Sequence, residues 1–164
     1  MTSIIKVDTL QKANGGTPTA ADLGINTTGT VLQVVNEYST NQISSTTLSR
    51  ITLNSLSVTP VATGSKFLIQ FFLYANWGPA HNGFGAYMYR NGSEIAKSGN
   101  QHSIYTNSIS DQYLGGAWSY IDSTGSTAGT SITFDLRARN YQTANVNYSH
   151  ASQSRGFIIT EIAG

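Results

Sequence analysis

The chain has 164 residues, 39% of them hydrophobic, which is enough for one packed core but not comfortably for two. Only 10% of the residues are charged, against about 25% in an average soluble domain, and a net charge of +1 with no run of lysine and arginine argues against a nucleic-acid partner. The absence of cysteine excludes disulfide bonds and thiolate chemistry.

Residues 1–30 are predicted to form an extended N-terminal arm. Ile5, Val7 and Leu10 are its apolar residues, and Asn-Gly-Gly-Thr-Pro at 14–18 is a strong turn signal. A segment this short cannot bury a core of its own. We therefore expect the three apolar side chains to anchor the arm on a neighbouring surface. The opening residues lack the apolar stretch of a signal peptide, so we expect no cleaved export signal.

From residue 31 the pattern changes to short β-strands separated by turns. The predicted strands are residues 31–38, 48–58, 65–77, 83–90, 93–97, 113–121, 131–139, 145–148 and 157–162. Asn91-Gly92 between two of them is a strong hairpin signal. A phase change in the apolar alternation near Asn54 and Ser55 indicates a β-bulge. Residues 31–164 are therefore predicted to be one antiparallel β-sandwich or jelly roll, an all-β domain.

The strand at 65–77 is apolar on both faces, whereas a strand of a simple sandwich has one face exposed to solvent. The second faces of this strand and the next carry Leu68, Phe72, Tyr74, Tyr87 and Tyr89. Burying such a side chain contributes about 1.5–3 kcal/mol, and large exposed apolar patches are rare on monomers. We therefore predict that these five residues form a subunit interface. The alternatives are that the arm or a long loop of the same chain covers them.

Candidate ligand-binding residues lie in two predicted loops. Trp77, His81 and Asn82 offer a ring, an imidazole and an amide, and His102 and Tyr105 lie in the loop at 98–111. Aromatic rings beside polar groups are suited to sugars, so we predict a receptor or glycan loop here. The alternative is that Trp77 ends a core strand. Trp118 could also stack on a sugar, although its position favours a core strand.

The sequence gives little support for catalysis, a metal or a cofactor. The histidines lie in predicted loops, and no two have zinc-ligand spacing: His81, His102 and His150. No Gly-x-Ser-x-Gly elbow positions a nucleophilic serine. Three aspartates could cluster, Asp111, Asp122 and Asp135, but no cleft between two carboxylates is indicated. The most apolar segment, residues 67–75, is far shorter than a membrane span, so no membrane insertion is expected.

Six short motifs follow one another along the chain. They are Ile-Lys-Val-Asp-Thr-Leu at 5–10, Gly-Thr-Val-Leu-Gln-Val-Val at 29–35, Thr-Pro at 59–60, Ser-Lys-Phe-Leu-Ile at 65–69, Arg-Asn-Gly-Ser-Glu-Ile at 90–95 and Ile-Ile-Thr-Glu-Ile at 158–162. Together they resemble a group of small structural and fibre-like virion proteins of marine and cyanobacterial tailed bacteriophages. The loops at 80–83 and 98–111 depart from that pattern, so no receptor is implied.

The resemblance implies a tail-fibre or capsid decoration protein exposed on the virion and assembled in the host cytoplasm. It also implies a homotrimer with a jelly-roll or tumour-necrosis-factor-like sandwich, attached to other virion proteins through the N-terminal segment. Our first hypothesis is thus a non-enzymatic structural protein with no cofactor, whose polar loops contact the host surface. The alternative is a carbohydrate-binding, lectin-like receptor-binding domain. A polysaccharide hydrolase has the least support.

Overall fold

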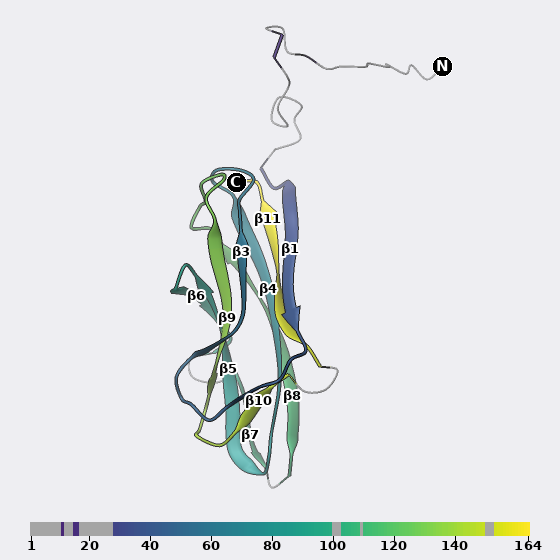
Figure 1. Cartoon of the computed structure of the whole chain (residues 1–164), viewed down its shortest axis with the longest axis vertical. Helices are drawn as coiled ribbons and strands as arrows, with labels where there is room; N and C mark the ends of the chain where they lie inside the picture. The colour runs from purple at the N-terminus through teal and green to yellow at the C-terminus, as the bar shows by residue number, and fades with distance from the viewer. Residues whose placement is uncertain (1–10, 12–14, 17–27, 100–102, 109, 150–152) are drawn as a thin grey trace, which may run out of the picture.

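The computed structural model describes residues 11, 15–16, 28–99, 103–108, 110–149 and 153–164, and the arm residues Ile5, Val7 and Leu10 lie outside them. Within the described ranges every regular element is a β-strand (Figure 1). Sheet A contains β1 (Val31–Ser39), β2 (Ile43–Ser45), β4 (Lys66–Trp77), β8 (Gln112–Asp122), β10 (Val146–Tyr148) and β11 (Arg155–Ile162). Sheet B contains β3 (Ile51–Val58), β5 (Ala80–Arg90), β6 (Ser93–Lys97), β7 (Ile104–Ser108) and β9 (Ile132–Asn140). The predicted all-β sandwich is confirmed.

The strand order is that of a jelly roll. The long strands of sheet A run β1–β11–β4–β8, and those of sheet B run β3–β9–β5, with β6 and β7 sharing the other edge of β5. All strand pairings among the described residues are antiparallel. The chain changes sheet from β2 to β3, β3 to β4, β4 to β5, β7 to β8, β8 to β9 and β9 to β10, so residues from the whole domain meet in one core.

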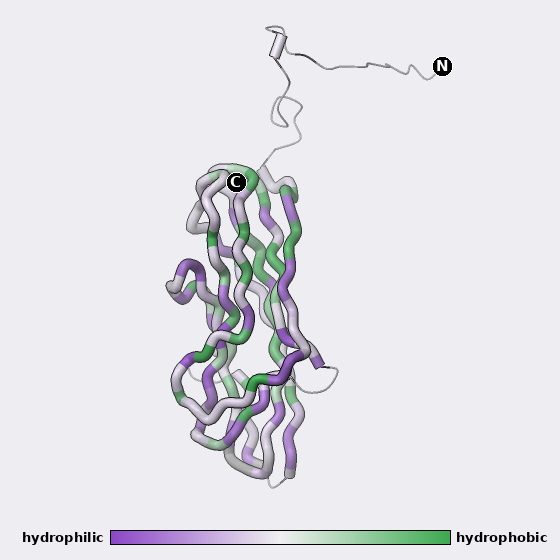
Figure 2. Tube along the Cα trace, viewed as in Figure 1, coloured by the Kyte–Doolittle hydropathy of each residue, from purple (hydrophilic) through white to green (hydrophobic). Residues whose placement is uncertain are grey.

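The core lies between the two sheets and is filled by alternate residues. In β4 the buried, inward-facing residues are Phe67, Ile69, Phe71, Leu73, Ala75 and Trp77. In β9 they are Ile132, Phe134, Leu136 and Ala138, as the alternation predicted. Rings from the two sheets meet, since Phe67 lies edge-on to Phe134 with centroids 5.5 Å apart. Figure 2 shows apolar residues recurring along the strands of both sheets.

Two local predictions are confirmed. The register of β3 against β9 shifts between Thr52 and Asn54, so that Leu53 and Asn54 are both buried, which is the predicted bulge. At the β5–β6 hairpin Asn91 has φ 48° and Gly92 has φ 82°. Both values are left-handed, as a two-residue type I′ turn requires.

The sequence did not predict β2 or β7. Both are short and rich in hydroxyl and amide side chains, so they lack an apolar alternation, and each is held by pairing to a neighbour. Strand β5 also starts three residues earlier than predicted, which shortens the expected loop at 77–83 to a turn. The early start depends on Gly83, because a Cβ there would lie 2.1 Å from the Ile104 carbonyl oxygen of β7.

The chain enters and leaves the sandwich at the same end, which we call the terminal pole (residues 28–30, 59–65, 123–131 and 163–164). Gly29 N donates to Ala163 O at 2.9 Å, and Ala163 N donates to Thr30 O at 2.8 Å. The opposite end, the distal pole, carries the β4–β5 turn at Gly78-Pro79 and the connection from β7 to β8 (Figure 1).

Candidate functional site

The outer face of sheet A presents apolar side chains across four strands. The even-numbered residues of β4 point away from the core, and cross-strand partners share a side of the sheet. Leu68 is paired with Ile121 of β8 and with Thr160 of β11. Beyond Thr160, Val34 of β1 completes the row. We call this surface the A face; its exposed apolar members are Val31, Val34, Tyr38, Tyr113, Ile121 and Ile158.

Three of the five residues predicted for a subunit interface belong to the A face. Leu68, Phe72 and Tyr74 all point outward and are half-buried by their neighbours. Glycines flank the two larger rings, because Phe72 pairs with Gly156 and Tyr74 pairs with Gly115. Because glycine has no side chain, the Phe72 and Tyr74 rings are not screened by these neighbours, and a flat partner surface can reach them.

Tyr87 and Tyr89 lie on the outer face of sheet B and are buried within the chain. The Arg50 guanidinium carbon lies 4.1 Å from the ring centroid of Tyr87, and that of Arg137 lies 4.1 Å from the ring centroid of Tyr89. Arg50 also donates to the Tyr89 hydroxyl and forms an ion pair with Glu94. The protein's own arginines thus cover these rings, so we leave Tyr87 and Tyr89 out of the interface proposed below.

Trp77 ends a core strand and does not line an exposed loop. Its side chain is only 1% exposed and lies edge-on to Phe84, with ring centroids 6.2 Å apart. Asn82 is also buried: its Nδ2 donates to Ala144 O at 2.9 Å, and its Oδ1 accepts from Gln142 N at 3.1 Å. Asn82 therefore fixes the β9–β10 connection, a role that depends on partners about sixty positions away in the sequence.

The other residues of the predicted glycan loop are not brought together. His81 belongs to β5 rather than to a loop, although its side chain is outside the description, and His102 lies outside the described residues. Tyr105 is exposed in β7, where its ring lies edge-on to Tyr141 with centroids 4.8 Å apart. The distal pole thus displays a tyrosine pair, but Trp77 and Asn82 are not available to join it.

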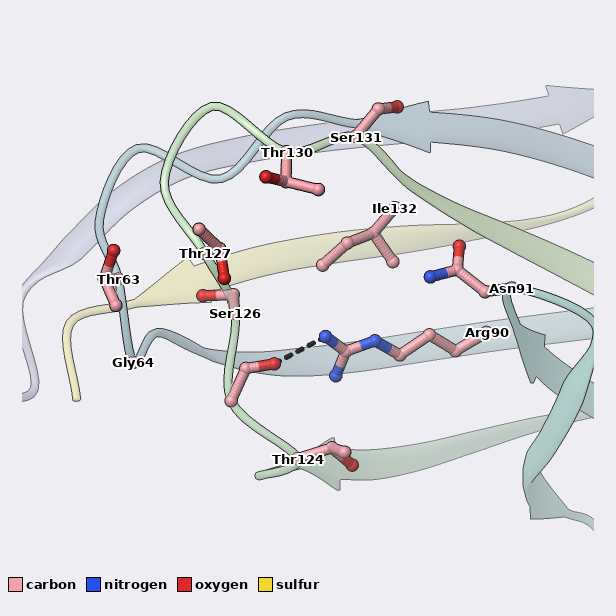
Figure 3. A pocket seen from close by; sticks show the side chains of 11 residues that line it. Thr63, Gly64, Arg90, Asn91, Thr124, Ser126, Thr127, Thr130, Ser131 and Ile132 are labelled. Carbon is pink, nitrogen blue, oxygen red and sulfur yellow. Dashed lines mark hydrogen bonds between the residues drawn. The ribbon is translucent and has the colours of Figure 1, made fainter.

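A polar hollow of about 440 Å³ opens at the terminal pole (Figure 3). Hydroxyl side chains from the β3–β4 turn and the β8–β9 connection line it together with Arg90, including Thr63, Ser126 and Thr127. Arg90 Nη1 donates to Asp122 Oδ2 at 2.7 Å.

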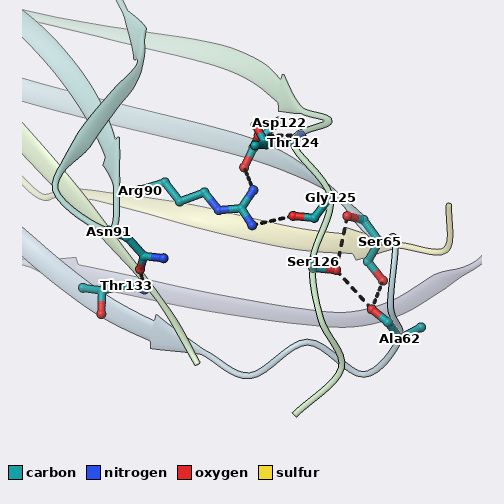
Figure 4. A network of polar contacts seen from close by, with 9 residues as sticks. All are labelled: Ala62, Ser65, Arg90, Asn91, Asp122, Thr124, Gly125, Ser126 and Thr133. Atoms are coloured by element: carbon teal, nitrogen blue, oxygen red, sulfur yellow. Dashed lines mark hydrogen bonds and ion pairs between the residues drawn. The ribbon is translucent and has the colours of Figure 1, made fainter. Parts of the chain in front are cut away.

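Arg90 and its neighbours form a polar network that fastens the β8–β9 connection to the β5–β6 hairpin (Figure 4). Besides Asp122, Arg90 binds the Gly125 carbonyl oxygen through Nη2. The second Asp122 oxygen accepts from Thr124 N at 3.0 Å and from the Thr124 hydroxyl. Both carboxylate oxygens of Asp122 are thus engaged. This geometry gives Asp122 a structural role, since neither of its carboxylate oxygens is free to accept a proton from a substrate.

The three aspartates considered from the sequence do not share a site. Asp122 belongs to sheet A and pairs with Arg90, whereas Asp135 belongs to sheet B, where Arg137 Nη2 lies 2.7 Å from its Oδ2. Among the residues that the structure describes, no three histidine, cysteine, aspartate or glutamate side chains are grouped to hold a metal ion. Over the same residues, no helix is long and apolar enough to span a membrane.

The chain matches no protein-family model, and a search of curated proteins finds no relative. A functional proposal therefore rests on the fold and the surfaces described above together with the sequence motifs.

Proposed function

We propose that this chain is a non-enzymatic structural protein of a bacteriophage virion, a short trimeric fibre or a decoration protein on the head or tail. In this proposal residues 1–30 attach to other virion proteins and the sandwich projects from the particle. The class of protein follows from the resemblance in the six sequence motifs. The observation that best supports an assembled state is the apolar A face.

The A face exposes apolar side chains in the rows of Leu68 and Phe72, which are separated by the row of Asn36, Ile158, Gln70 and Ser119. Val34 and Ile121, at the two ends of one cross-strand row, are 59% and 58% exposed, and large apolar patches on soluble proteins commonly mark interaction sites. No lysine, arginine or carboxylate interrupts the rows from residue 68 to residue 74 of β4. Burying this face between copies would remove it from water, at about 25 cal/mol for each Å² of apolar area.

The positions of the two poles are consistent with the proposed attachment. Residues 28–30, which follow the arm, are fastened beside the C-terminus at the terminal pole. An arm docked on a particle would therefore hold the terminal pole against it and present the distal pole outward. The distal connections would then be the part of the protein that faces the host.

The first experiment measures the solution mass of the purified full-length chain by multi-angle light scattering. We expect three times 17.6 kDa. Ile121→Asp should release monomers with an unchanged far-UV spectrum, because this side chain is mostly exposed within one chain and a buried carboxylate at an interface is costly. Leu48→Asp is the matched control, since Leu48 is also exposed but lies in the β2–β3 connection and not on the A face. A wild-type mass of 17.6 kDa would contradict the proposal.

A polysaccharide hydrolase remains the least supported alternative. The two aspartates with described side-chain partners are neutralised by separate arginines on different sheets. A glycosidase needs two carboxylates flanking one cleft. A carbohydrate-binding role has more support, from a groove at the edge of the sandwich.

A further inference from the structure

A groove of about 400 Å³ runs between β6 and β8, where the edges of the two sheets do not meet. Its volume is within the roughly 300–1,000 Å³ range of small-molecule sites. Trp118 and Tyr120 line it from β8, and Glu94, Ile95 and Lys97 line it from β6. All five positions are on strands, so the groove is built from the rigid part of the fold.

Trp118 is held as a fixed aromatic platform. Its indole stacks on Phe71 of β4, with ring centroids 5.5 Å apart and an interplanar angle of 28°. The six-membered ring lies over Gly116, where an added Cβ would be 2.6 Å from Cζ2 and 2.7 Å from Cη2. Since Phe71 is buried in the core, the stacking anchors one side of the groove, and little rotamer freedom is lost when a ligand binds.

Tyr120 adds a second aromatic group to the same side of the groove. It follows Trp118 by two residues on β8, so the two side chains share a face and lie about 7 Å apart along the strand. Tyr120 is 37% exposed although it points toward the core side. The exposure arises because β6 has only five residues and does not cover this end of β8.

The β6 side of the groove has Ile95 and Ala96 against the core and two charged residues at its rim, Glu94 and Lys97, whose cross-strand partners Tyr89 and Tyr87 lie on the outer face of sheet B. Glu94 and Lys97 are both exposed on β6. Glu94 is held through its Oε2 by the ion pair with Arg50, which in turn stacks on Tyr87. Glu94 is already paired with Arg50, so Lys97 is the charged donor left on this side of the groove, and its exposed ammonium group can donate hydrogen bonds to uncharged hydroxyl groups.

We propose that this groove binds a neutral oligosaccharide. The apolar faces of two successive sugar rings would contact Trp118 and Tyr120, and hydroxyl groups at the edges of the rings would bond with Lys97 at the rim. Rings with an apolar face and polar edges match such a wall better than a purely apolar ligand does. The proposal deepens the carbohydrate-binding alternative and moves its site from the distal pole to the β6–β8 edge.

The test uses the full-length chain and an immobilised array of neutral oligosaccharides of glucose, galactose, mannose and rhamnose. A retained oligosaccharide is then titrated while acrylamide quenching of tryptophan fluorescence is measured. The chain has two tryptophans. Trp77 is buried, so quenching reports on Trp118. We expect the sugar to protect Trp118 from acrylamide.

Tyr120→Ala is the decisive variant, because Trp118→Ala would also remove a core contact and risk unfolding. We expect Tyr120→Ala to weaken binding about tenfold and Lys97→Met to weaken it less. Tyr105→Ala is the matched control: it removes an exposed tyrosine from the distal pole and should leave the affinity unchanged.

Three outcomes would overturn the proposal. The array could retain the chain on no neutral oligosaccharide. Tyr105→Ala could lose binding while Tyr120→Ala keeps it, which would return the site to the distal pole. Tyr120→Ala could lower the mass in light scattering while sugars leave Trp118 unprotected, which would show that a second copy fills the groove. Light scattering tests the proposed trimer and protection of Trp118 from acrylamide tests the proposed sugar site. Failure of one proposal can therefore be distinguished from failure of the other.

Discussion

Glu161 is a carboxylate in the interior of a protein that has few charges. It points inward from β11, is 0% exposed, and closes the β3–β4 turn. Ser65 Oγ donates to it at 2.6 Å, Val61 N at 2.9 Å and Ala62 N at 3.2 Å, and Gln33 Nε2 donates to the other oxygen at 2.5 Å. Burial alone would raise the pKa of Glu161, but these hydrogen bonds outweigh burial and hold the pKa below its usual value.

The lowered pKa predicts how stability depends on pH. The ionised form of Glu161 stabilises the fold above the pKa that the residue has in the unfolded chain, and this contribution is lost as pH falls through the lower folded pKa. Glu161→Gln should lower the free energy of unfolding at pH 7 by about 1–3 kcal/mol, because an amide NH₂ would face backbone donors. The difference from wild type should shrink in acid, measured by urea unfolding at pH 7 and near pH 3.

Asp111→Asn is the control for this prediction, because Asp111 is exposed at the distal pole. It should change the free energy of unfolding by less than about 0.5 kcal/mol. An effect of Glu161→Gln that is equally large at both pH values would show that shape and not ionisation matters at this position.

Arg155, at the other end of β11, is a buried cation held by carbonyl groups. Its Nη1 contacts Asn41 O, Tyr148 O and Ser149 Oγ, and its Nη2 donates to Leu53 O at 3.3 Å. Burial lowers the pKa of Arg155. Sequence reasoning identified neither Arg155 nor Glu161, because their partners are brought together only by the folded sheet.

At the level of elements, β11 is the strand on which sheet A depends, since it pairs with β1 on one side and β4 on the other. Gly156 makes the approach of β1 possible. A Cβ at this position would lie 2.2 Å from the Glu37 carbonyl oxygen and 2.7 Å from Tyr38 Cα. Both atoms are backbone atoms, so the strands would have to separate.

Gly156→Ala should therefore destabilise the sandwich by about 1–3 kcal/mol and speed amide exchange in the second half of β1. Gly78→Ala is the control, because its new Cβ would meet only the Asp111 side chain at 3.8 Å. Hydrogen exchange followed by NMR or mass spectrometry measures both. Unchanged protection of residues 36–39 in Gly156→Ala would contradict the prediction.

The elements that could be predicted from the sequence are those whose signal is local. The alternation of Ile132, Phe134, Leu136 and Ala138 and the Asn-Gly hairpin are properties of neighbouring residues, and both predictions hold. The prediction of a loop at 77–83 was wrong because the contacts that decide the structure there are made with residues distant in sequence. Glycine, proline and asparagine there resemble a loop, but Asn82 is buried by partners in the β9–β10 connection and Gly83 by its contact with β7.

For the candidate surfaces, the sequence predicted which side chains of β4 point outward but not what covers the outward rings of β5. The doubly apolar pattern of β4 correctly marked Leu68, Phe72 and Tyr74 as pointing away from the core. The same pattern in β5 could not reveal that Arg50 and Arg137, distant in sequence, lie over Tyr87 and Tyr89. A periodic pattern reports which side of a strand is apolar, whereas the group that covers it is set by the tertiary fold.

At the level of the whole molecule, the proposed function assigns attachment to the terminal pole and display to the distal pole. A chain lacking residues 1–26 keeps the described contacts of residues 28–30 with Ala163 and Gly164. We expect it to unfold at the same temperature as the full-length chain but to lose binding to particles that lack the protein. Calorimetry and co-sedimentation measure the two effects, and binding that survives the deletion would show that the sandwich itself makes the attachment.

The side-by-side position of β1 and β11 also determines how the domain responds to force. A particle pulling on residue 28 while a host surface holds the distal pole would load β1 along its length. The backbone hydrogen bonds between β1 and β11, whose pairing extends from Val31 to Ser39, would then be strained in shear and share the load. Pulling the N-terminal and C-terminal residues apart would instead peel the same bonds one after another. The fold therefore withstands tension best along the axis on which a surface-mounted fibre is pulled.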